Sequence, residues 1–283
     1  MMNLIRADIY RIFRGKGIYI TLFFLLCIII MQVTAGAYMN AGIRVDDFEL
    51  IDTLSDPDNA STQIDDLSIG NGLEPFQRPF GAEAPFVAMS FTDGLLYFLL
   101  PLLIFISTAD FTSGAVKNTL ASGMSRLEFY VSKLTLSCVT CFLLLLSYVL
   151  LSTIFATLVS GFGATLDWEY VSGVLKVFAI QLWLVLAVTC VGHFFIFVMR
   201  SGMVIGVYIA FLLVPSVVLF LLSFINKWFM NLLVYDLRMG LGATLNISVM
   251  PAGDVLKTVL VGAMYIIAAT VGGFMLFRRA EIK

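Results

Sequence analysis

Six long stretches without Asp, Glu, Lys or Arg dominate this sequence and limit what it can fold into. A helix rises about 1.5 Å per residue, so about 20 apolar residues cross a hydrocarbon core of roughly 30 Å. Continuously apolar stretches of this length lack the alternation of barrel strands and predict transmembrane helices. The six predicted spans are residues 17–38, 94–109, 134–160, 177–199, 202–224 and 258–277.

The composition excludes a soluble globular chain and a disordered one. Hydrophobic residues make up 60% of the 283 residues and charged residues 13%, against roughly half and a quarter in soluble domains. A disordered chain combines low hydrophobicity with high net charge, whereas the net charge here is −2 and gives no general attraction to nucleic acid. We therefore expect an all-α polytopic membrane protein, one transmembrane domain over residues 1–283, surrounded by a lipid bilayer and without a nucleic-acid partner.

Lys and Arg are unevenly distributed between the two sides of the predicted spans. Eleven of the 17 basic residues lie at the two termini and in the loops of the same side, and six lie on the opposite side. Because cytoplasmic loops carry the excess of Lys and Arg, both termini are predicted to be cytoplasmic. Residues 1–16 are predicted to form an amphipathic leader helix at the inner membrane surface. The basic residues of this leader are Arg6, Arg11, Arg14 and Lys16.

Two polar segments are predicted on the outer side. Residues 39–93 contain eleven acidic residues and form an acidic extracellular loop, which either meets a cationic substrate or is a solvated loop that helps to fix the topology. Residues 226–257 predict short amphipathic helices at the outer interface, with Trp228 and Tyr235 at the level of the lipid headgroups. Partial re-entry of this second segment into the membrane remains an alternative.

The inner connection over residues 110–133 contains clear helix-capping signals. Ser125 and Glu128 have the spacing of a capping box, which predicts a helix that begins near Arg126. Upstream, Thr112 or Ser113 is expected to cap a short helix that ends at Gly123. A short helix, a glycine turn and a long helix can pass motion from a cytosolic partner into the membrane, or can simply be a well-capped connection.

Motifs for catalysis and for ATP binding are missing from the sequence. There is no G-x-x-x-x-G-K-[S/T] loop, so any ATPase is expected to be another polypeptide. There is no G-x-S-x-G motif and no acidic residue inside a predicted span. The C-x-x-C pair Cys138 and Cys141 lies in an apolar stretch without further metal ligands nearby in the sequence. We expect no catalytic residue, cofactor or metal in this chain.

Four residues inside the predicted spans are candidates for a transport pathway. Gln181 and His193 are polar residues in the fourth span, where such side chains either form interhelical hydrogen bonds or line a pathway. Pro101 and Pro215 are expected to kink the second and fifth spans, which suits helices that rearrange but also ordinary packing.

The order of these features resembles the ABC-2 type permeases, the membrane subunits of ATP-binding-cassette exporters. The resemblance covers the whole chain and is most specific over residues 110–133, where an acid closes the second span and a glycine, a basic residue and a Ser-Arg pair follow before a Lys. The residues that match this pattern are Asp110, Gly114, Lys117, Ser125, Arg126 and Lys133. The sequence departs from it in having Asp rather than Glu at 110, and Gly123-Met124 where a proline commonly precedes Ser-Arg.

The resemblance implies a half-transporter in the bacterial cytoplasmic membrane. A second permease subunit, identical or similar, completes the pathway, and a separate nucleotide-binding subunit of the ATP-binding-cassette type binds ATP and Mg. The leader, with Arg6, Arg11, Arg14 and Lys16, docks onto that subunit together with the 110–133 element. The implied coupling residues of this element are Asp110, Gly114, Lys117, Ser125, Arg126 and Glu128.

The implied cargo is an amphipathic antimicrobial peptide or toxin that is moved outward. Alternatives are an exporter of the same class with a lipid, drug or ion as cargo, an ATP-independent channel or sensor subunit, and a membrane enzyme. A conductance without nucleotide would indicate the channel, and an enzyme would require a catalytic pair that the sequence does not contain.

Overall fold

The computed structural model describes residues 6–10, 14–15, 18–34, 84–90, 92–112, 114–160, 167–199, 203–246 and 252–279. Within these ranges every regular element is a helix. Residues 6–10 are helical and precede the apolar helix Ile18–Thr34. The later elements are α3 (Ala84–Ser90), α4 (Thr92–Thr112), α5 (Ala115–Ala121), α6 (Arg126–Ser160), α7 (Trp168–Met199), α8 (Val204–Ser223), η2 (Lys227–Tyr235), α9 (Leu237–Ala243), η3 (Thr244–Asn246) and α10 (Ala252–Arg279).

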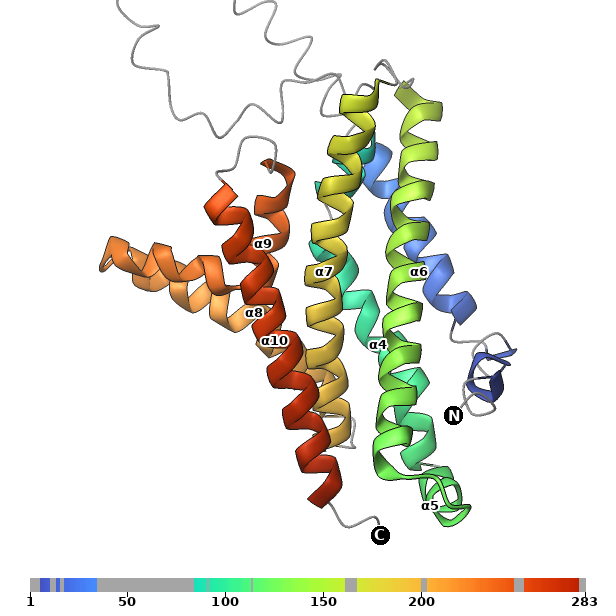
Figure 1. Cartoon of the computed structure of the whole chain (residues 1–283). Coiled ribbons are helices and arrows are strands. Elements are labelled where there is room, and N and C mark those ends of the chain that lie inside the picture. The colour runs from blue at the N-terminus through green and yellow to red at the C-terminus, as the bar shows by residue number, and fades with distance from the viewer. Residues whose placement is uncertain are drawn as a thin grey trace, which may run out of the picture.

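Helix α7 is the centre of a bundle of upright helices (Figure 1). It contacts α3, α4, α6, α8, α9 and α10. Its most apolar 18-residue window is 61% buried, against 22–33% for the corresponding windows of α6, α8 and α10. The Ile18–Thr34 helix runs beside α6, where the Tyr148 hydroxyl donates a hydrogen bond of 2.7 Å to the side-chain oxygen of Gln32. The outer helices therefore leave broad apolar faces uncovered within the single chain.

Four of the described helices are long and apolar enough to cross a membrane. They are Arg126–Val159, Tyr170–Met199, Val204–Ser223 and Ala252–Arg279, and each corresponds to one of the last four predicted spans. The first two predicted spans correspond to shorter apolar stretches, Ile18–Thr34 and Thr92–Ile104. The helical membrane class is thus confirmed, whereas the number of six spans and their orientation stay predictions.

Helices α6 and α7 extend well beyond the uncharged stretches that predicted them. Helix α6 has 35 residues, so at about 1.5 Å per residue it measures roughly 52 Å, longer than the hydrocarbon core. It begins at Arg126, as the capping box predicted, eight residues before the uncharged stretch 134–160, and Lys133 lies inside it. A count of uncharged residues identifies only the part of a helix that can lie in the hydrocarbon core. Backbone hydrogen bonding and capping determine where the helix begins and ends.

Helix α8 and η2 form an arm that leaves the bundle (Figure 1). Helix α8 leads outward and η2 returns in contact with it, and α9 then packs against α4 and α7. The short helices predicted between residues 226 and 257 are present as η2, α9 and η3. Trp228 and Tyr235 are more than half exposed. Buried Leu237 and Leu241 anchor α9 in the core.

The end of the segment predicted as an acidic loop is helical and packed. Helix α3 contacts α6 and α7, and α4 begins at Thr92, before the span predicted from residue 94. Ala88, Met89 and Thr92 are buried, which corrects the prediction of a loop for this part. The pattern was missed because α3 has only seven residues, too few to establish a helical period. Residues 39–83 lie outside the described ranges.

Candidate functional site

Helix α5 is held between two glycines in the left-handed conformation, at the lower end of the bundle in Figure 1. Gly114 has φ 69° and Gly123 has φ 95°. A Cβ at either position would meet nothing within 4 Å, so the backbone conformation, not space, favours glycine here. These two turns let α4, α5 and α6 follow one another closely, and we call this region the α5 end of the bundle.

The capping of α5 differs from the prediction. Its N-cap is Gly114, which makes no side-chain cap. Thr112 is the last residue of α4, two residues before this N-cap position. Ser113 lies outside the described residues. The chain instead turns through Gly114, whose N–H donates to the Phe111 carbonyl at 3.4 Å. The short helix, glycine turn and long helix are otherwise as predicted.

The capping box at the start of α6 is confirmed. The Ser125 Oγ accepts a hydrogen bond of 3.1 Å from the Glu128 N–H, and the Glu128 Oε2 accepts one of 3.0 Å from the Ser125 N–H. Two N–H groups of the helix terminus that would otherwise lack partners are thereby satisfied. Ser125 and Glu128 thus have a structural role at the α5 end.

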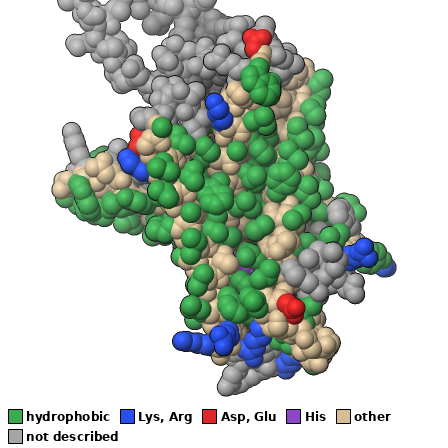
Figure 2. Space-filling view, viewed as in Figure 1, with side chains coloured by type: hydrophobic (Ala, Val, Ile, Leu, Met, Phe, Trp, Pro, Cys, Tyr) green, Lys and Arg blue, Asp and Glu red, His purple; other side chains and the backbone are tan. Residues whose placement is uncertain are grey.

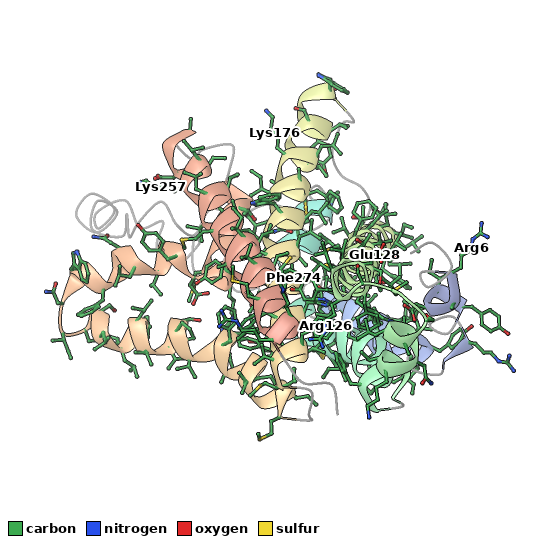
Figure 3. All side chains as sticks on the ribbon, turned by 60° about the horizontal axis from the view of Figure 1, so that its bottom comes forward. Arg6, Arg126, Glu128, Lys176, Lys257 and Phe274 are labelled. Carbon is green, nitrogen blue, oxygen red and sulfur yellow. The ribbon has the colours of Figure 1, made fainter. Side chains whose placement is uncertain are left out.

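Arg126 connects the start of α6 to the end of α10. Its Nη1 donates to the Arg278 carbonyl at 2.6 Å and to the Phe277 carbonyl at 3.4 Å. Carbonyls of a last helical turn lack intrahelical partners and carry the negative end of the helix dipole, so a guanidinium stabilises them. Figure 3 shows Arg126 and Glu128 toward the α5 end, which is turned to the front of that view, whereas Lys176 and Lys257 lie away from it.

A buried ion pair attaches the leader to α6. The Lys133 Nζ lies 2.5 Å from the Asp8 Oδ2, and the two side chains are 0% and 7% exposed. The Lys133 ammonium also lies 5.7 Å from the ring centroid of Phe129. Asp8 is the buried residue of the segment 6–10, whereas its apolar neighbour Ile9 is exposed. Among residues 6–10 the leader therefore binds the bundle through the charge of Asp8.

An aromatic cluster fills the bundle behind these polar contacts. Phe111, Phe129, Phe197 and Phe277 come from four different helices, and their ring centroids lie 5.0–6.4 Å apart where they contact one another. Edge-on and offset contacts of this kind are favourable beyond the area that they bury. The cluster makes the ends of α4, α6, α7 and α10 one packed unit.

The other predicted coupling residues have different surroundings. Asp110 lies in the last turn of α4, and nothing is described of its side chain. Lys117 is exposed on α5, and its side chain has no partner among the described residues. Arg6 and Arg14 are exposed, and Arg14 donates to the Tyr10 hydroxyl at 2.8 Å. Arg11 and Lys16 lie outside the described residues.

Gln181 is the centre of a buried hydrogen-bond network in the other half of the bundle. Its amide nitrogen donates to the Met89 carbonyl at 2.9 Å and to the Thr244 hydroxyl at 3.1 Å. Its side-chain oxygen accepts from the Thr92 hydroxyl at 2.8 Å. The network joins α7 to α3, α4 and η3, as in the interhelical alternative. The pathway alternative is untested.

His193 lies in the aromatic cluster. It is fully buried, with its ring centroid 4.4 Å from Phe197 and 5.0 Å from Tyr130. Within the described ranges neither ring nitrogen has a hydrogen-bond partner. Pro101 lies inside α4 and Pro215 inside α8, and their kinking of these helices stays a prediction. Pro215 lines a cavity beside the arm.

The described residues offer no arrangement of three or more His, Cys, Asp or Glu side chains that suits a metal ion. Cys27, Cys138, Cys141 and Cys190 are free thiols. The absence of a cofactor from this chain stays a prediction.

Sequence reasoning missed the Asp8–Lys133 pair and the partners of Gln181. The only available signal for the pair was that Asp8 is the single acid of the leader and Lys133 the last charge before the third span. For the network, no local pattern linked Gln181 to Thr92 or Thr244, which lie 89 and 63 residues away.

Comparison with protein-family models finds no match to this chain, and comparison with curated proteins finds none either.

Proposed function

We propose that this chain is the permease subunit of an ATP-binding-cassette exporter of the ABC-2 type. The observation that carries the proposal is α5, a short surface helix held between two left-handed glycines and directly connected to two long helices. Its Lys117 side chain is exposed and without a described partner, as a docking residue would be. A partner that binds α5 can therefore push on both α4 and α6.

The contacts around α5 support the transmission of such a push. The capping box fixes the first turn of α6, Arg126 holds the end of α10, and Lys133 holds the leader through Asp8. The aromatic cluster joins these helices to α7. A movement at α5 would thus reach four helices as one body rather than being lost in a loop.

The proposed assembly also contains a nucleotide-binding subunit and a second permease subunit. The chain has no phosphate-binding loop, so ATP and Mg are bound by a separate nucleotide-binding subunit at the α5 end. The apolar faces of α6, α8 and α10 face lipid and a second permease subunit. Lys and Arg side chains gather at the α5 end of the hydrophobic flank, which supports a cytoplasmic position for this end (Figure 2).

The cargo in this proposal is an amphipathic molecule, such as an antimicrobial peptide or toxin, that leaves through the bacterial cytoplasmic membrane. Asp236 and the aromatic residues that line the cavity beside the arm support a cargo with both charge and apolar surface.

The experiment that tests the proposal is affinity purification of the tagged chain from its native membranes, with mass spectrometry and an ATPase assay. We expect an ATP-binding-cassette subunit to accompany the wild type and to be lost from Lys117→Glu. The matched control is Lys176→Glu, an exposed lysine at the opposite end (Figure 3). Recovery of the chain alone under several mild detergents, without ATPase activity, would contradict the proposal and favour the channel or sensor subunit.

A further inference from the structure

A cavity of about 120 Å³ lies at the root of the arm, between α8, η2, α9 and α10. Its apolar wall is formed by Phe211, Pro215 and Leu219 of α8, Leu232 of η2 and Tyr265 of α10. Since one water occupies roughly 30 Å³, the cavity has room for a small head group and a short hydrocarbon segment. The apolar wall favours the hydrocarbon segment.

One polar group in this cavity lacks the partner that its chemistry requires. Asp236 lines the cavity, and its two carboxylate oxygens differ. The Oδ1 caps α9 by accepting a hydrogen bond of 2.8 Å from the Arg238 N–H. The Oδ2 is buried and has no hydrogen-bond partner among the described residues. A buried carboxylate oxygen without a partner is costly, so a cationic donor at this position would be strongly favoured.

The neighbouring cation does not supply that donor. Arg238 also lines the cavity, but its Nε pairs with the Asp93 Oδ2 at 3.6 Å. No ion pair of Asp236 exists within the described part of the chain. Asp93, Arg238 and Asp236 together carry one net negative charge, so the cavity is complementary to a single positive charge.

The aromatic wall adds to this preference. The rings of Phe211 and Tyr265 meet edge to face with centroids 6.1 Å apart, and both line the cavity. Faces of such rings attract ammonium groups, more strongly where water is excluded. Outside the cavity, α8 also exposes apolar side chains, among them Val214, Val217, Val218 and Leu221.

We propose that the cavity at the root of the arm binds the protonated amine of an amphipathic molecule, with Asp236 as its counter-charge. The amine forms a charge-assisted hydrogen bond to the Oδ2, and the hydrocarbon part lies against Pro215 and Leu219. The assignment of this molecule as cargo rests on the proposed export function, whereas the binding itself requires only this chain. The same chemistry is present in a lipid with an amine head group.

Binding of radiolabelled n-octylamine to the full chain in phosphatidylglycerol nanodiscs tests the site. Asp236→Asn is the informative variant, because an Asn oxygen still caps α9 while the charge is lost. We expect the affinity for octylamine to fall ten- to a hundredfold, as for the loss of a hydrogen bond to a charged group. The matched control is Asp254→Asn, an exposed acid of α10 that pairs with Lys257 and should leave the affinity unchanged.

A second variant tests the cavity without changing the charge of Asp236. Leu219→Trp fills the cavity and leaves Asp236 in place, and it should also lower octylamine binding. Unlabelled n-octanol should compete poorly with octylamine, because it lacks the charge. Equal binding to wild type and Asp236→Asn, or equal competition by octanol and octylamine, would overturn the proposal.

Two further arms separate the possible sources of the amine and the possible failures. Displacement of octylamine by phosphatidylethanolamine in the nanodiscs indicates a lipid head group as the source, and no displacement argues against this lipid. If an ATPase subunit co-purifies but octylamine does not bind, the proposed amine site is overturned and the exporter proposal stands. If octylamine binds at Asp236 but no ATPase partner co-purifies, the exporter proposal is overturned and the proposed amine site stands.

Discussion

Removal of one partner from the Asp8–Lys133 pair should release the leader from the bundle. The Lys133 side chain is 0% exposed and its ammonium lies 2.5 Å from the Asp8 carboxylate. Loss of one partner of a buried pair costs about 3–5 kcal/mol, because the other buried charge loses that counter-charge. At about 1.4 kcal/mol per factor of ten, Asp8→Asn should raise the population of leader-undocked chains by roughly a hundredfold to a few thousandfold.

Limited trypsin digestion in detergent measures this release, because exposed Arg6 and Arg14 flank the segment that holds Asp8. Cleavage follows the equilibrium population of the open form when closing is fast relative to cleavage. Asp8→Asn should be cut much faster than wild type at these sites. The control Asp254→Asn, which disturbs an exposed pair instead, should be cut like wild type.

The double variant Asp8→Leu/Lys133→Met separates a lost pair from a generally weakened fold. Replacement of both charges by apolar side chains of similar volume is often neutral or stabilising, so the leader should be protected again. The introduced methionine would also place a thioether near the Phe129 ring, whose centroid lies 5.7 Å from the Lys133 ammonium. Wild-type cleavage of Asp8→Asn, or cleavage of the double variant as fast as that of the single one, would refute the reasoning.

Three further variants test the packing of the bundle by thermal unfolding in detergent. Gln181→Leu should destabilise the protein by about 1–2 kcal/mol, because the Met89 carbonyl loses one of its two donors and the Thr92 hydroxyl loses the Gln181 acceptor; an unchanged midpoint would contradict this role. Gly262→Ala should cost about 1–3 kcal/mol, since the new Cβ would lie 2.6 Å from the Trp183 ring nitrogen. Gly253→Ala on the same helix meets nothing within 4 Å and should be neutral or slightly stabilising, so equal effects would argue against close packing. Ser125→Ala should lower the free energy of unfolding by about 1 kcal/mol, because the cap of α6 is lost. Unchanged stability would show that the capping box does not stabilise the protein.

Local features of this chain were predictable from its sequence, because a few neighbouring residues determine them. The capping box needs only Ser125 and Glu128, and the turn before it needs only Gly123. The apolar stretches of α6, α7, α8 and α10 identify helices that can cross a membrane. These patterns did not require knowledge of how the helices pack.

Contacts between distant segments were not predictable in this way. Asp8 and Lys133 lie 125 residues apart, and many other pairings of the same charges fit the sequence equally well. Arg126 was predicted as a coupling residue, and its contact with the end of α10 depends on how α6 and α10 pack. The unpaired Asp236 oxygen likewise results from the arm, α9 and α10 meeting at one place.

The most direct test of the central claim is photo-crosslinking from α5 in native membranes. A benzoylphenylalanine at Lys117 places the reactive group on the exposed side of α5, and the same group at Lys176 serves as control at the opposite end. We predict that position 117 crosslinks to an ATP-binding-cassette subunit and that position 176 does not. Crosslinks from position 117 to lipid or to other copies of this chain only, with ATP present and absent, would contradict the account.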